Sequence, residues 1–259
     1  MKTRELICNE LNDFLYQNDH VLAVWEGGSV ATGFADEYSD LDLVIVVNDD
    51  YVEEMFRSLD EFINQKYRTI RKFRVPEPAW HGFSQTFYQA QDVPEYFYFD
   101  ISVMKKSLED KFLETNRHGT PKIWFEKEIF VLPVDSNQDD IDKRTKKLFQ
   151  MATATDFITI LEIKKGIKRG LFSEVFPLYF TFIVRHLVAL LNIIHRPEKA
   201  DFNLRYIYRD YPLQDYKLIE DGLQVVNISD LSLKFNLLLE KYEALKLEIL
   251  NPNNVQATA

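Results

Sequence analysis

Cysteine is nearly absent from this sequence: its 259 residues include one, Cys8. A single cysteine excludes an intramolecular disulfide and any zinc site built from cysteines. A chain without disulfides is typical of a reducing compartment. We therefore expect a cytoplasmic protein in which Cys8 is an inert core thiol.

Positive charge is in the minority, with 31 basic against 41 acidic side chains and a net charge of -10. No Lys/Arg block is dense enough to form a continuous phosphate-tracking stripe, which argues against nucleic acid as a partner. Residues 1–20 carry too many charges to contain the apolar stretch of a secretory signal. We therefore expect nothing at this end that directs export.

The longest apolar run, Val175 to Ile194, has about the length of a membrane span. It contains Pro177 near its start and Arg185-His186 at its centre. Two charged or polar side chains in mid-span are costly in a bilayer. The run predicts a buried helix, and we expect no membrane partner.

The hydrophobic pattern of the first half alternates between helical and strand periods. Apolar residues behind a Thr3 N-cap predict an opening helix. The nearly all-apolar run LDLVIVV predicts a strand covered on both faces. Together the patterns predict an α/β (α+β) domain with a mixed sheet, formed by strands at 21–25, 41–47, 67–74, 83–90 and 96–104 and a helix at 52–65, with the last two strands pairing as a hairpin.

A polar stretch at 135–147 breaks the periodicity and marks the predicted domain boundary. We expect a first domain at 1–138 and an all-helical domain at 139–259. Its helices are predicted at 141–166, 173–195, part of 203–226 and 229–250, followed by a frayed tail at 251–259.

Three of the eight glycines, Gly27, Gly28 and Gly33, fall within seven residues directly after a predicted strand. Such clustering indicates a close approach of the backbone. The loop matches neither a Walker A motif nor the dinucleotide-binding fingerprint. If Ser29 opens a short helix, its hydroxyl and the free N–H groups of the first turn can hold a phosphate. Gly27 and Gly33 are interpreted as turn residues.

The segment Ser39-Asp40-Leu41-Asp42 runs into the best-defined strand. Residues two apart on a strand share a face, so Asp40 and Asp42 are expected roughly 7 Å apart along it. Two such carboxylates repel by about 2 to 3 kcal/mol at an effective dielectric of about 20. A divalent cation would compensate that repulsion, and oxygen-only ligands suit Mg²⁺ or Mn²⁺.

Asp100 lies in the aromatic strand YFYFDISVM, at 96–104. The alternation places its carboxylate on the face opposite the core. A carboxylate there needs a cation, a hydrogen-bonding partner or water. A metal ion shared with Asp40 and Asp42 would meet that need, whereas a structural hydrogen bond is the alternative reading.

Taken together, Gly28-Ser29, then ten residues, then Asp40-Leu41-Asp42 on a hydrophobic strand, with Asp100 on a later strand, resemble the nucleotidyltransferase superfamily. The motif resemblance covers residues 26–47 and the strand of Asp100. Within the superfamily, the chain looks most similar to the antibiotic adenylyltransferases of the streptomycin 6-adenylyltransferase type. Residues 169–172 and Glu174, before the long apolar helix, resemble that type's C-terminal domain.

The resemblance implies two Mg²⁺ or Mn²⁺ ions held by the catalytic residues Asp40, Asp42 and Asp100. It implies that Gly28 and Ser29, with Ser39 beside them, bind ATP or another NTP. It also implies in-line attack of an acceptor hydroxyl on the α-phosphorus with release of pyrophosphate.

The acceptor half departs from the antibiotic-modifying type. That type carries a carboxylate base within its C-terminal helix, whereas residues 179–194 contain no acid and offer Arg185 and His186. These two side chains could contact the triphosphate or the acceptor. An ion pair between domains or a satisfied core histidine is the structural alternative.

Aromatic residues flank the predicted strand of Asp100 and either line an acceptor pocket or cover the sheet: Trp80, Phe83, Phe87, Tyr88, Tyr96 and Tyr98. Three functions stay open on the sequence alone. The first is transfer of AMP to a small molecule such as an aminoglycoside-like antibiotic. The second is nucleotidylation of a protein, and the third is a nucleotide-binding regulator without turnover. The sequence does not indicate an oligomeric state.

Overall fold

The protein is described by a computed structural model that covers residues 2–79, 81–109, 111 and 113–251. Two compact units make up the chain, Met1–Ser136 and Asn137–Ala259. The division falls two residues before the boundary expected from the polar stretch. Apart from Asn251, the tail predicted to fray lies outside the described residues.

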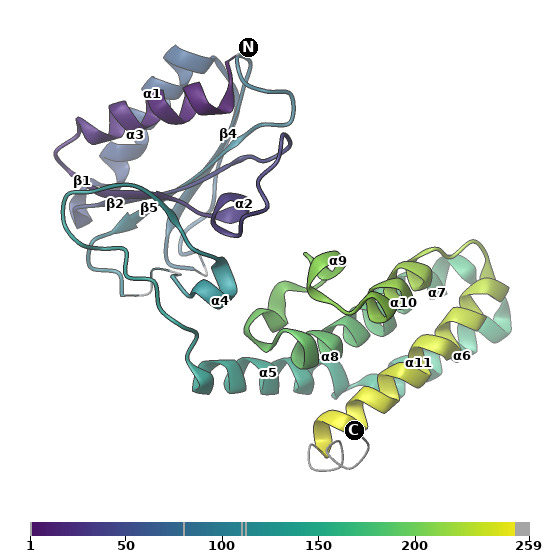
Figure 1. The fold of residues 1–259 in the computed structure, drawn as a ribbon. Coiled ribbons are helices and arrows are strands. Elements are labelled where there is room, and N and C mark those ends of the chain that lie inside the picture. Colours follow the sequence, from purple (N-terminus) through teal and green to yellow (C-terminus); the bar gives the residue numbers. More distant parts are fainter. Residues whose placement is uncertain (1, 80, 110, 112, 252–259) are drawn as a thin grey trace. The chain divides into compact units, whose positions relative to one another are not determined.

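The first unit contains a six-stranded sheet in the order β3-β4-β5-β2-β1-β6 (Figure 1). Strands β2 and β5 pair in parallel, and the other pairs are antiparallel, so the predicted mixed sheet is confirmed. The predicted pairing of β4 with β5 is also confirmed. The strands are β1 (Val21–Glu26), β2 (Leu41–Val47), β3 (Thr69–Arg74), β4 (Ser84–Ala90), β5 (Phe99–Lys105) and β6 (Lys122–Glu126).

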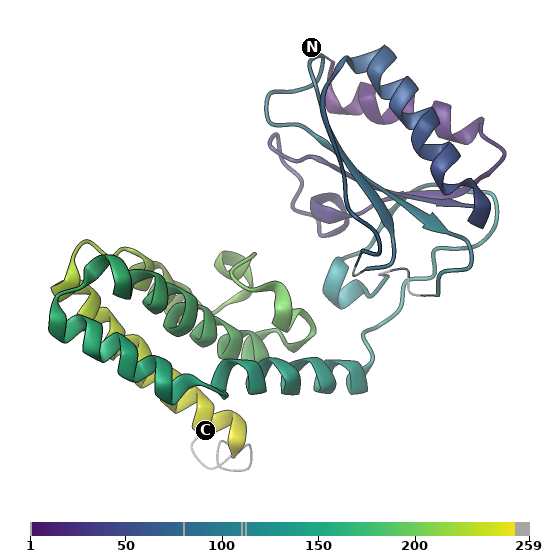
Figure 2. The same ribbon diagram turned by 180° about the vertical axis from the view of Figure 1, so that it is seen from behind.

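Helices α1 (Arg4–Tyr16) and α3 (Val52–Tyr67) cover one face of this sheet, as both ribbon views show (Figures 1 and 2). The hydroxyl of Thr3 accepts a hydrogen bond from the N–H of Leu6 and caps α1 as predicted. The apolar sides of the two helices meet alternate residues of the strands. This packing forms the main core, which includes Leu11, Ile45, Leu59, Phe99 and Ile101.

The opposite face of the sheet carries apolar and acidic side chains at different ends of its central strands. A smaller apolar cluster, which includes Trp25, Val46 and Met104, lies at one end. At the other end of β2 and β5 the same face carries the half-buried Asp42 and Asp100. Strands β2 and β5 therefore pack one face into the core and carry two half-buried aspartates on the other face.

Strand β6 and the short helix α4 (Thr115–His118) were not predicted. The five residues of β6 include Lys122 and Glu126, and none of the five is buried. A short strand with charged ends has no period-2 hydrophobic signal. It exists because it pairs with β1, whose six residues are all buried.

The second unit is largely helical, as predicted. Its apolar core gathers side chains such as Tyr179, Leu187, Phe235 and Tyr242. The elements are α5 (Gln138–Thr153), α6 (Asp156–Arg169), α7 (Phe172–Leu178), the π-helical η2 (Tyr179–Val184), α8 (Arg185–His195), the 3₁₀ segment η3 (Pro197–Phe202), α9 (Ile207–Asp210), α10 (Leu213–Leu223) and α11 (Ile228–Leu250).

The prediction of a single helix over 141–166 is wrong, because α5 ends at Thr153 and α6 begins at Asp156. Side chains of α11 bind the adjoining ends of these two helices. The hydroxyl of Tyr242 donates to the carbonyl of Ala152 at 3.0 Å and to the carboxylate of Asp156 at 3.1 Å, and Lys246 pairs with the same carboxylate. Periodicity within one segment does not reveal such a contact from a distant helix.

The segment Phe172–His195 is one continuous helix, long and apolar enough to cross a membrane by length and composition. Half of its most apolar window is buried inside the structure. Within it, η2 is a π-helical turn in which Tyr179, Ile183 and Val184 are buried. The helix thus contributes a central layer of the core of the second unit.

Candidate functional site

Asp42 and Asp100 lie side by side on neighbouring strands. In the parallel pairing of β2 with β5, Asp42 is the register partner of Asp100. Residues in register point to the same face of a sheet. Across the next pair, Asp100 faces Phe87 on β4, which in turn faces Phe73 on β3. The two carboxylates therefore end a cross-strand row on the face opposite α1 and α3.

The glycine loop touches this row directly. Helix α2 (Gly28–Ala31) follows β1, and the N–H of Gly27 donates to the carbonyl of Asp42 at 2.9 Å. Gly28 has φ +53°, and a Cβ atom there would lie 1.7 Å from Oδ2 of Asp42. Glycine is required at this position because the carboxylate of Asp42 occupies the space of a side chain.

Asp40 is held by groups outside the ladder of β2. The hydroxyl of Tyr98 hydrogen-bonds to its side chain, and the N–H of Leu41 donates to the carbonyl of Tyr98 at 3.2 Å. Burial and the charges of Asp40, Asp42 and Asp100 raise the pKa of Tyr98. Tyr98 thus remains a neutral donor that faces three acidic side chains.

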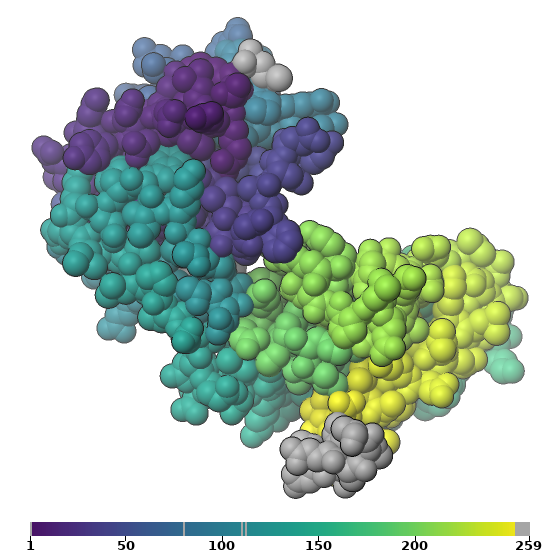
Figure 3. Space-filling view, in the orientation of Figure 1, coloured from purple at the N-terminus to yellow at the C-terminus, as the bar shows by residue number. Residues whose placement is uncertain are grey.

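Ser29 and Ser39 differ in their surroundings. Ser29 is half-buried in α2, and its hydroxyl makes no hydrogen bond within the described part of the chain. The first N–H groups of any helix lack partners inside the helix. Ser39 closes a turn instead: its hydroxyl donates to Asp36 Oδ1 at 3.0 Å and accepts from the N–H of Asp36 at 2.9 Å. In the space-filling view the segment from α2 to β2, in indigo, lies at the surface of the first unit (Figure 3).

The pKa of Asp100 is set by burial, one neutral donor and one neighbouring acid. Burial raises its pKa to about 6, a hydrogen bond from Gln85 opposes that rise, and the charge of Asp40 adds to it. The donor is Nε2 of Gln85, 2.6 Å from Asp100 Oδ1. A raised carboxylate pKa from burial and a like charge is characteristic of functional sites.

The three aspartates do not form a preassembled metal centre. In the described residues no group of three or more His, Cys, Asp or Glu side chains is arranged to hold a metal ion. Three carboxylates repel one another, by about 2 kcal/mol for a pair 7 Å apart at an effective dielectric of 20. That repulsion favours a spread arrangement until a cation compensates it.

The donor chemistry nevertheless fits a hard divalent cation. The adjacent pair Asp42 and Asp100 offers carboxylate oxygens only, which Mg²⁺ and Mn²⁺ prefer. Burial and the charge of Asp40 raise the pKa of Asp100, and a bound cation would oppose both effects. The roles predicted for Asp40, Asp42 and Asp100 as metal ligands stay predictions.

Some of the aromatic residues near β5 belong to the core, and others are exposed as an acceptor pocket would require. Phe83 and Tyr88 are buried and belong to the apolar clusters. Tyr96 and Tyr98 are exposed, and Tyr98 contacts Phe87 with ring centroids 6.2 Å apart. Trp80 lies outside the described residues. An aromatic surface thus lies next to Asp100, while two of the six predicted residues belong to the core.

Sequence reasoning missed the segment that holds the far end of α2. The N–H of Thr120 donates to the carbonyl of Ala31 at 2.9 Å. Gly119 has φ +81°, and a Cβ atom there would lie 2.3 Å from the same carbonyl oxygen. A lone glycine between a short helix and β6 was the only available signal, and it does not say what the glycine touches.

Arg185 and His186 make contacts within the second unit. Nη2 of Arg185 donates to Oδ1 of Asn203 at 3.2 Å. Burial and then the charge of Arg185 lower the pKa of His186, which hydrogen-bonds the backbone of Ala152. Its ring meets that of Phe182 edge-on at 5.4 Å. Their predicted contacts with triphosphate or acceptor stay predictions.

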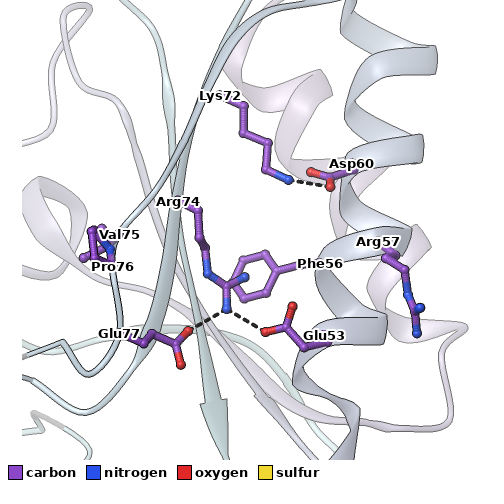
Figure 4. A pocket seen from close by; sticks show the side chains of 9 residues that line it. All are labelled: Glu53, Phe56, Arg57, Asp60, Lys72, Arg74, Val75, Pro76 and Glu77. Carbon is purple, nitrogen blue, oxygen red and sulfur yellow. Dashed lines mark hydrogen bonds and ion pairs between the residues drawn. The ribbon is translucent and has the colours of Figure 1, made fainter.

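A pocket of about 390 Å³ lies elsewhere on the first unit, between α3 and the edge strand β3 (Figure 4). Lys72 and Arg74 flank Phe73 on β3, so they point to the face opposite Asp100. Arg74 pairs with Glu53 and Glu77, and Lys72 pairs with Asp60. The charges of the pocket are therefore compensated internally. Its lining residues are Glu53, Phe56, Arg57, Asp60, Lys72, Arg74, Val75, Pro76 and Glu77.

Comparison with known families yields one match. The sequence profile of the nucleotidyltransferase domain matches residues 8–174, which is more than half of the chain. The matched region includes β1, α2, β2 and β5, and it extends through α6 into α7. No curated protein matches the sequence.

Solved structures give weaker similarities. An aminoglycoside 6-adenyltransferase from Bacillus subtilis is 11% identical with a TM-score of 0.39, over 95% of this chain and 89% of its own. A nucleotidyltransferase-like protein from Exiguobacterium sibiricum is 12% identical with a TM-score of 0.35, over 95% and 74%. The spectinomycin adenyltransferase AAD(9) from Enterococcus faecialis, solved with ATP and spectinomycin, is 14% identical with a TM-score of 0.34, over 93% and 100%.

Proposed function

Because the chain belongs to the nucleotidyltransferase domain family, we propose that it transfers a nucleoside monophosphate from an NTP, with ATP as the expected donor, to a hydroxyl of a small molecule. Pyrophosphate is the second product. An aminoglycoside-like antibiotic is the proposed acceptor class.

One observation supports the proposal most directly: the glycine loop is in direct contact with Asp42, one of the paired aspartates. Asp42 is in register with Asp100, and its carboxylate lies where a side chain on Gly28 would be. A phosphate held by the first turn of α2 would therefore lie beside two carboxylates. Anionic groups this close are compatible only if a divalent cation lies between them.

The chemistry assigned to the protein is binding and alignment. The N–H groups of α2 and the hydroxyl of Ser29 would bind the triphosphate, and Asp42 and Asp100, with Asp40, would hold Mg²⁺ or Mn²⁺. When bound, the cation supplies positive charge that offsets the charge of the phosphates. The acceptor oxygen forms a bond to the α-phosphorus, the bond from that phosphorus to the bridging oxygen breaks, and the acceptor gives up its hydroxyl proton to a base.

Net charge supports a cationic acceptor. The chain carries a charge of -10, and Asp40, Asp42 and Asp100 add negative charge at the site itself. A field of one sign raises the local concentration of oppositely charged substrates. Polyamine-like antibiotics such as aminoglycosides are cations of this kind.

A nucleotide-binding regulator without turnover is the second candidate. It is favoured because the described residues contain no group of three or more His, Cys, Asp or Glu side chains arranged to hold a metal ion, and because residues 179–194 contain no acid to serve as a base. Such a protein would bind an NTP with Mg²⁺ but release no pyrophosphate with any acceptor.

The test is pyrophosphate release from each of the four NTPs with Mg²⁺, measured against aminoglycosides, spectinomycin and lincosamides. Acceptor-dependent release, with a mass increase of one nucleoside monophosphate on the acceptor, is the expected result. Labelled protein in a cell lysate without any small-molecule product would move the acceptor class to proteins. Tight NTP binding without pyrophosphate from any acceptor would support the regulator.

Two glycines of one loop provide a matched pair of variants. Gly28 and Gly33 both have positive φ, but a Cβ atom would clash with Asp42 only at Gly28, and nothing lies within 4 Å of one at Gly33. Gly28→Ala is expected to remove most activity, whereas Gly33→Ala costs only the backbone strain of about 1 kcal/mol. Equal losses in the two variants would contradict the role of the Gly28–Asp42 contact.

A further inference from the structure

Glu26 occupies an unusual place for a carboxylate. It is the last residue of β1, directly before the glycine loop, and its side chain is fully buried. Register with Leu43 of β2 places it on the face covered by α1. A buried carboxylate is costly unless it is paired. Its partner is Arg4, the first residue of α1.

The guanidinium of Arg4 also reaches the candidate site. The same nitrogen that pairs with Oε1 of Glu26, Nη2, donates to the backbone carbonyl of Asp40 at 3.1 Å. On its other side, Nη1 lies 3.9 Å from Sγ of Cys8. One side chain therefore joins the end of β1 to the residue that precedes β2.

Stability alone is a weak explanation for this ion pair. Buried ion pairs often contribute little net stability, because desolvation offsets the attraction. In this pair, Oε2 of Glu26 and Nε of Arg4 are buried, and no group of the described residues hydrogen-bonds to them. The contact that remains unexplained is the one to Asp40.

Asp40 needs such a contact because it lies outside the strand. Strand β2 begins at Leu41, so the carbonyl of Asp40 is not held by the ladder between β2 and β5. Tyr98 holds its carboxylate, and Arg4 holds its carbonyl. The direction of the Asp40 side chain relative to Asp42 depends on both.

We propose that Arg4, fixed by the buried Glu26, is a positioning residue for the carboxylate site: it sets the backbone of Asp40 and so the reach of its carboxylate toward a divalent cation. This inference rests on the proposed function. It assigns Arg4 no contact with substrate. It predicts that loss of Arg4 weakens cation binding by about tenfold, the size of effect typical when a group that orients a metal ligand is removed.

The test measures Mn²⁺ binding by electron paramagnetic resonance, which needs no acceptor and no turnover. The variants are Arg4→Met and the control Lys2→Met. Lys2 pairs with Glu10 at 2.7 Å, just before the same helix, and the side chains of Lys2 and Arg4 are both 26% exposed. We expect Arg4→Met to bind Mn²⁺ about tenfold more weakly and Lys2→Met to bind as the wild type does.

A double variant separates positioning from stability. Arg4→Met alone leaves the charge of Glu26 buried and unpaired, so its melting temperature is expected to fall. Arg4→Met/Glu26→Met removes both charges and is expected to regain thermal stability while Mn²⁺ binding stays weak. If the double variant binds Mn²⁺ as tightly as the wild type, the contact to Asp40 has no positioning role and the inference is wrong.

The same Mn²⁺ titration separates a failure of the proposed function from a failure of the inference about Arg4. Wild-type protein that binds no Mn²⁺, with or without ATP, contradicts the proposed function, and the inference falls with it. Wild-type binding that Arg4→Met leaves unchanged contradicts the inference alone. Arg4→Lys, which keeps a cation beside Glu26, is expected to bind Mn²⁺ with an affinity between those of wild type and Arg4→Met.

Discussion

Asp100 and Asp215 are both sheltered aspartates, and their pKa values shift in opposite directions. Burial and, to a smaller extent, the charge of Asp40 raise the pKa of Asp100 to about 6 against the opposing hydrogen bond from Gln85. Burial acts in the same direction on Asp215, but bonds from Lys241 and His195 outweigh it and lower the pKa. The difference is whether the fold supplies a positive partner.

The cluster around Asp215 is complete within the second unit. Asp215 on α10 lies 2.8 Å from Nε2 of His195, at the end of α8, and 2.9 Å from Nζ of Lys241 on α11. Three helices are joined by one carboxylate. Among the described residues, the groups that act on Asp100 are the acid Asp40 and the amide of Gln85, with the phenol of Tyr98 nearby. The Asp215 cluster is compensated by its own partners, whereas the Asp100 cluster has the excess of acid that the proposed cation site requires.

The largest expected difference between the clusters is in activity. Asp42→Asn removes a ligand of the proposed cation and is expected to lower the rate of pyrophosphate release by about a thousandfold, since a bound cation contributes several kcal/mol and each 1.36 kcal/mol is a factor of ten. Asp215→Asn, assayed where it is folded, is expected to retain activity. A similar loss in both would mean that the clusters do not differ in function.

Stability should respond in the opposite order. Asp215→Asn is expected to lower the free energy of unfolding at pH 7 by about 2 to 3 kcal/mol, because the ammonium group of Lys241 and the ring of His195 lose a charged acceptor. The folded-state pKa of Asp215 is depressed, so its contribution is present above the usual aspartate value of about 3.9 and is lost as pH falls through the folded value. Urea denaturation at pH 7 and pH 3 measures both.

Glu162→Gln is the control for that experiment. Glu162 pairs with Lys165 at 2.6 Å on an exposed surface of α6. Exposed ion pairs contribute about 0 to 1 kcal/mol, so this variant should be nearly neutral. A loss as large as that of Asp215→Asn would show that burial of the carboxylate is not what matters.

Asp100→Asn is expected to stabilise the protein in the presence of a chelator, by about 1 to 2 kcal/mol at pH 7. The native state holds the proton of Asp100 more tightly than the unfolded chain does, because the folded-state pKa of about 6 exceeds the usual aspartate value. Stability of the wild type therefore falls as pH rises from about 4 to about 6. Denaturation of both proteins at pH 4 and pH 7 checks the sign, and a variant less stable than wild type at pH 7 would contradict it.

Much of the first unit was predictable because its signals are local. The run LDLVIVV predicted β2 with its bounds, and Thr3 predicted the start of α1. The proximity of Gly28, Asp42 and Asp100 has a simple basis: a glycine follows one strand, and the acids lie at corresponding points of two others.

The rest depends on contacts between distant segments. Strand β6 exists through its pairing with β1, and the break before α6 is held by Tyr242 and Lys246 of α11. The bond from Arg4 to the carbonyl of Asp40 spans 36 residues. Amino-acid type and periodicity contain no information about such partners, so the groups that orient the site were found only in three dimensions.

The smallest predicted effect concerns Tyr98, the neutral hydrogen-bond donor next to the aspartates of the candidate site. Tyr98→Phe removes a hydrogen bond to Asp40 and is expected to cost about 1 kcal/mol, a factor of about five in the apparent KM for Mg²⁺-NTP. Tyr88→Phe is its control, since Tyr88 donates to Asp60 at 3.0 Å on the helix-covered face. Steady-state kinetics at varied Mg²⁺ concentration compares the two variants. A KM change shared by both would reflect a general loss of packing. A change confined to Tyr98→Phe would support the view that the orientation of Asp40 sets cation affinity.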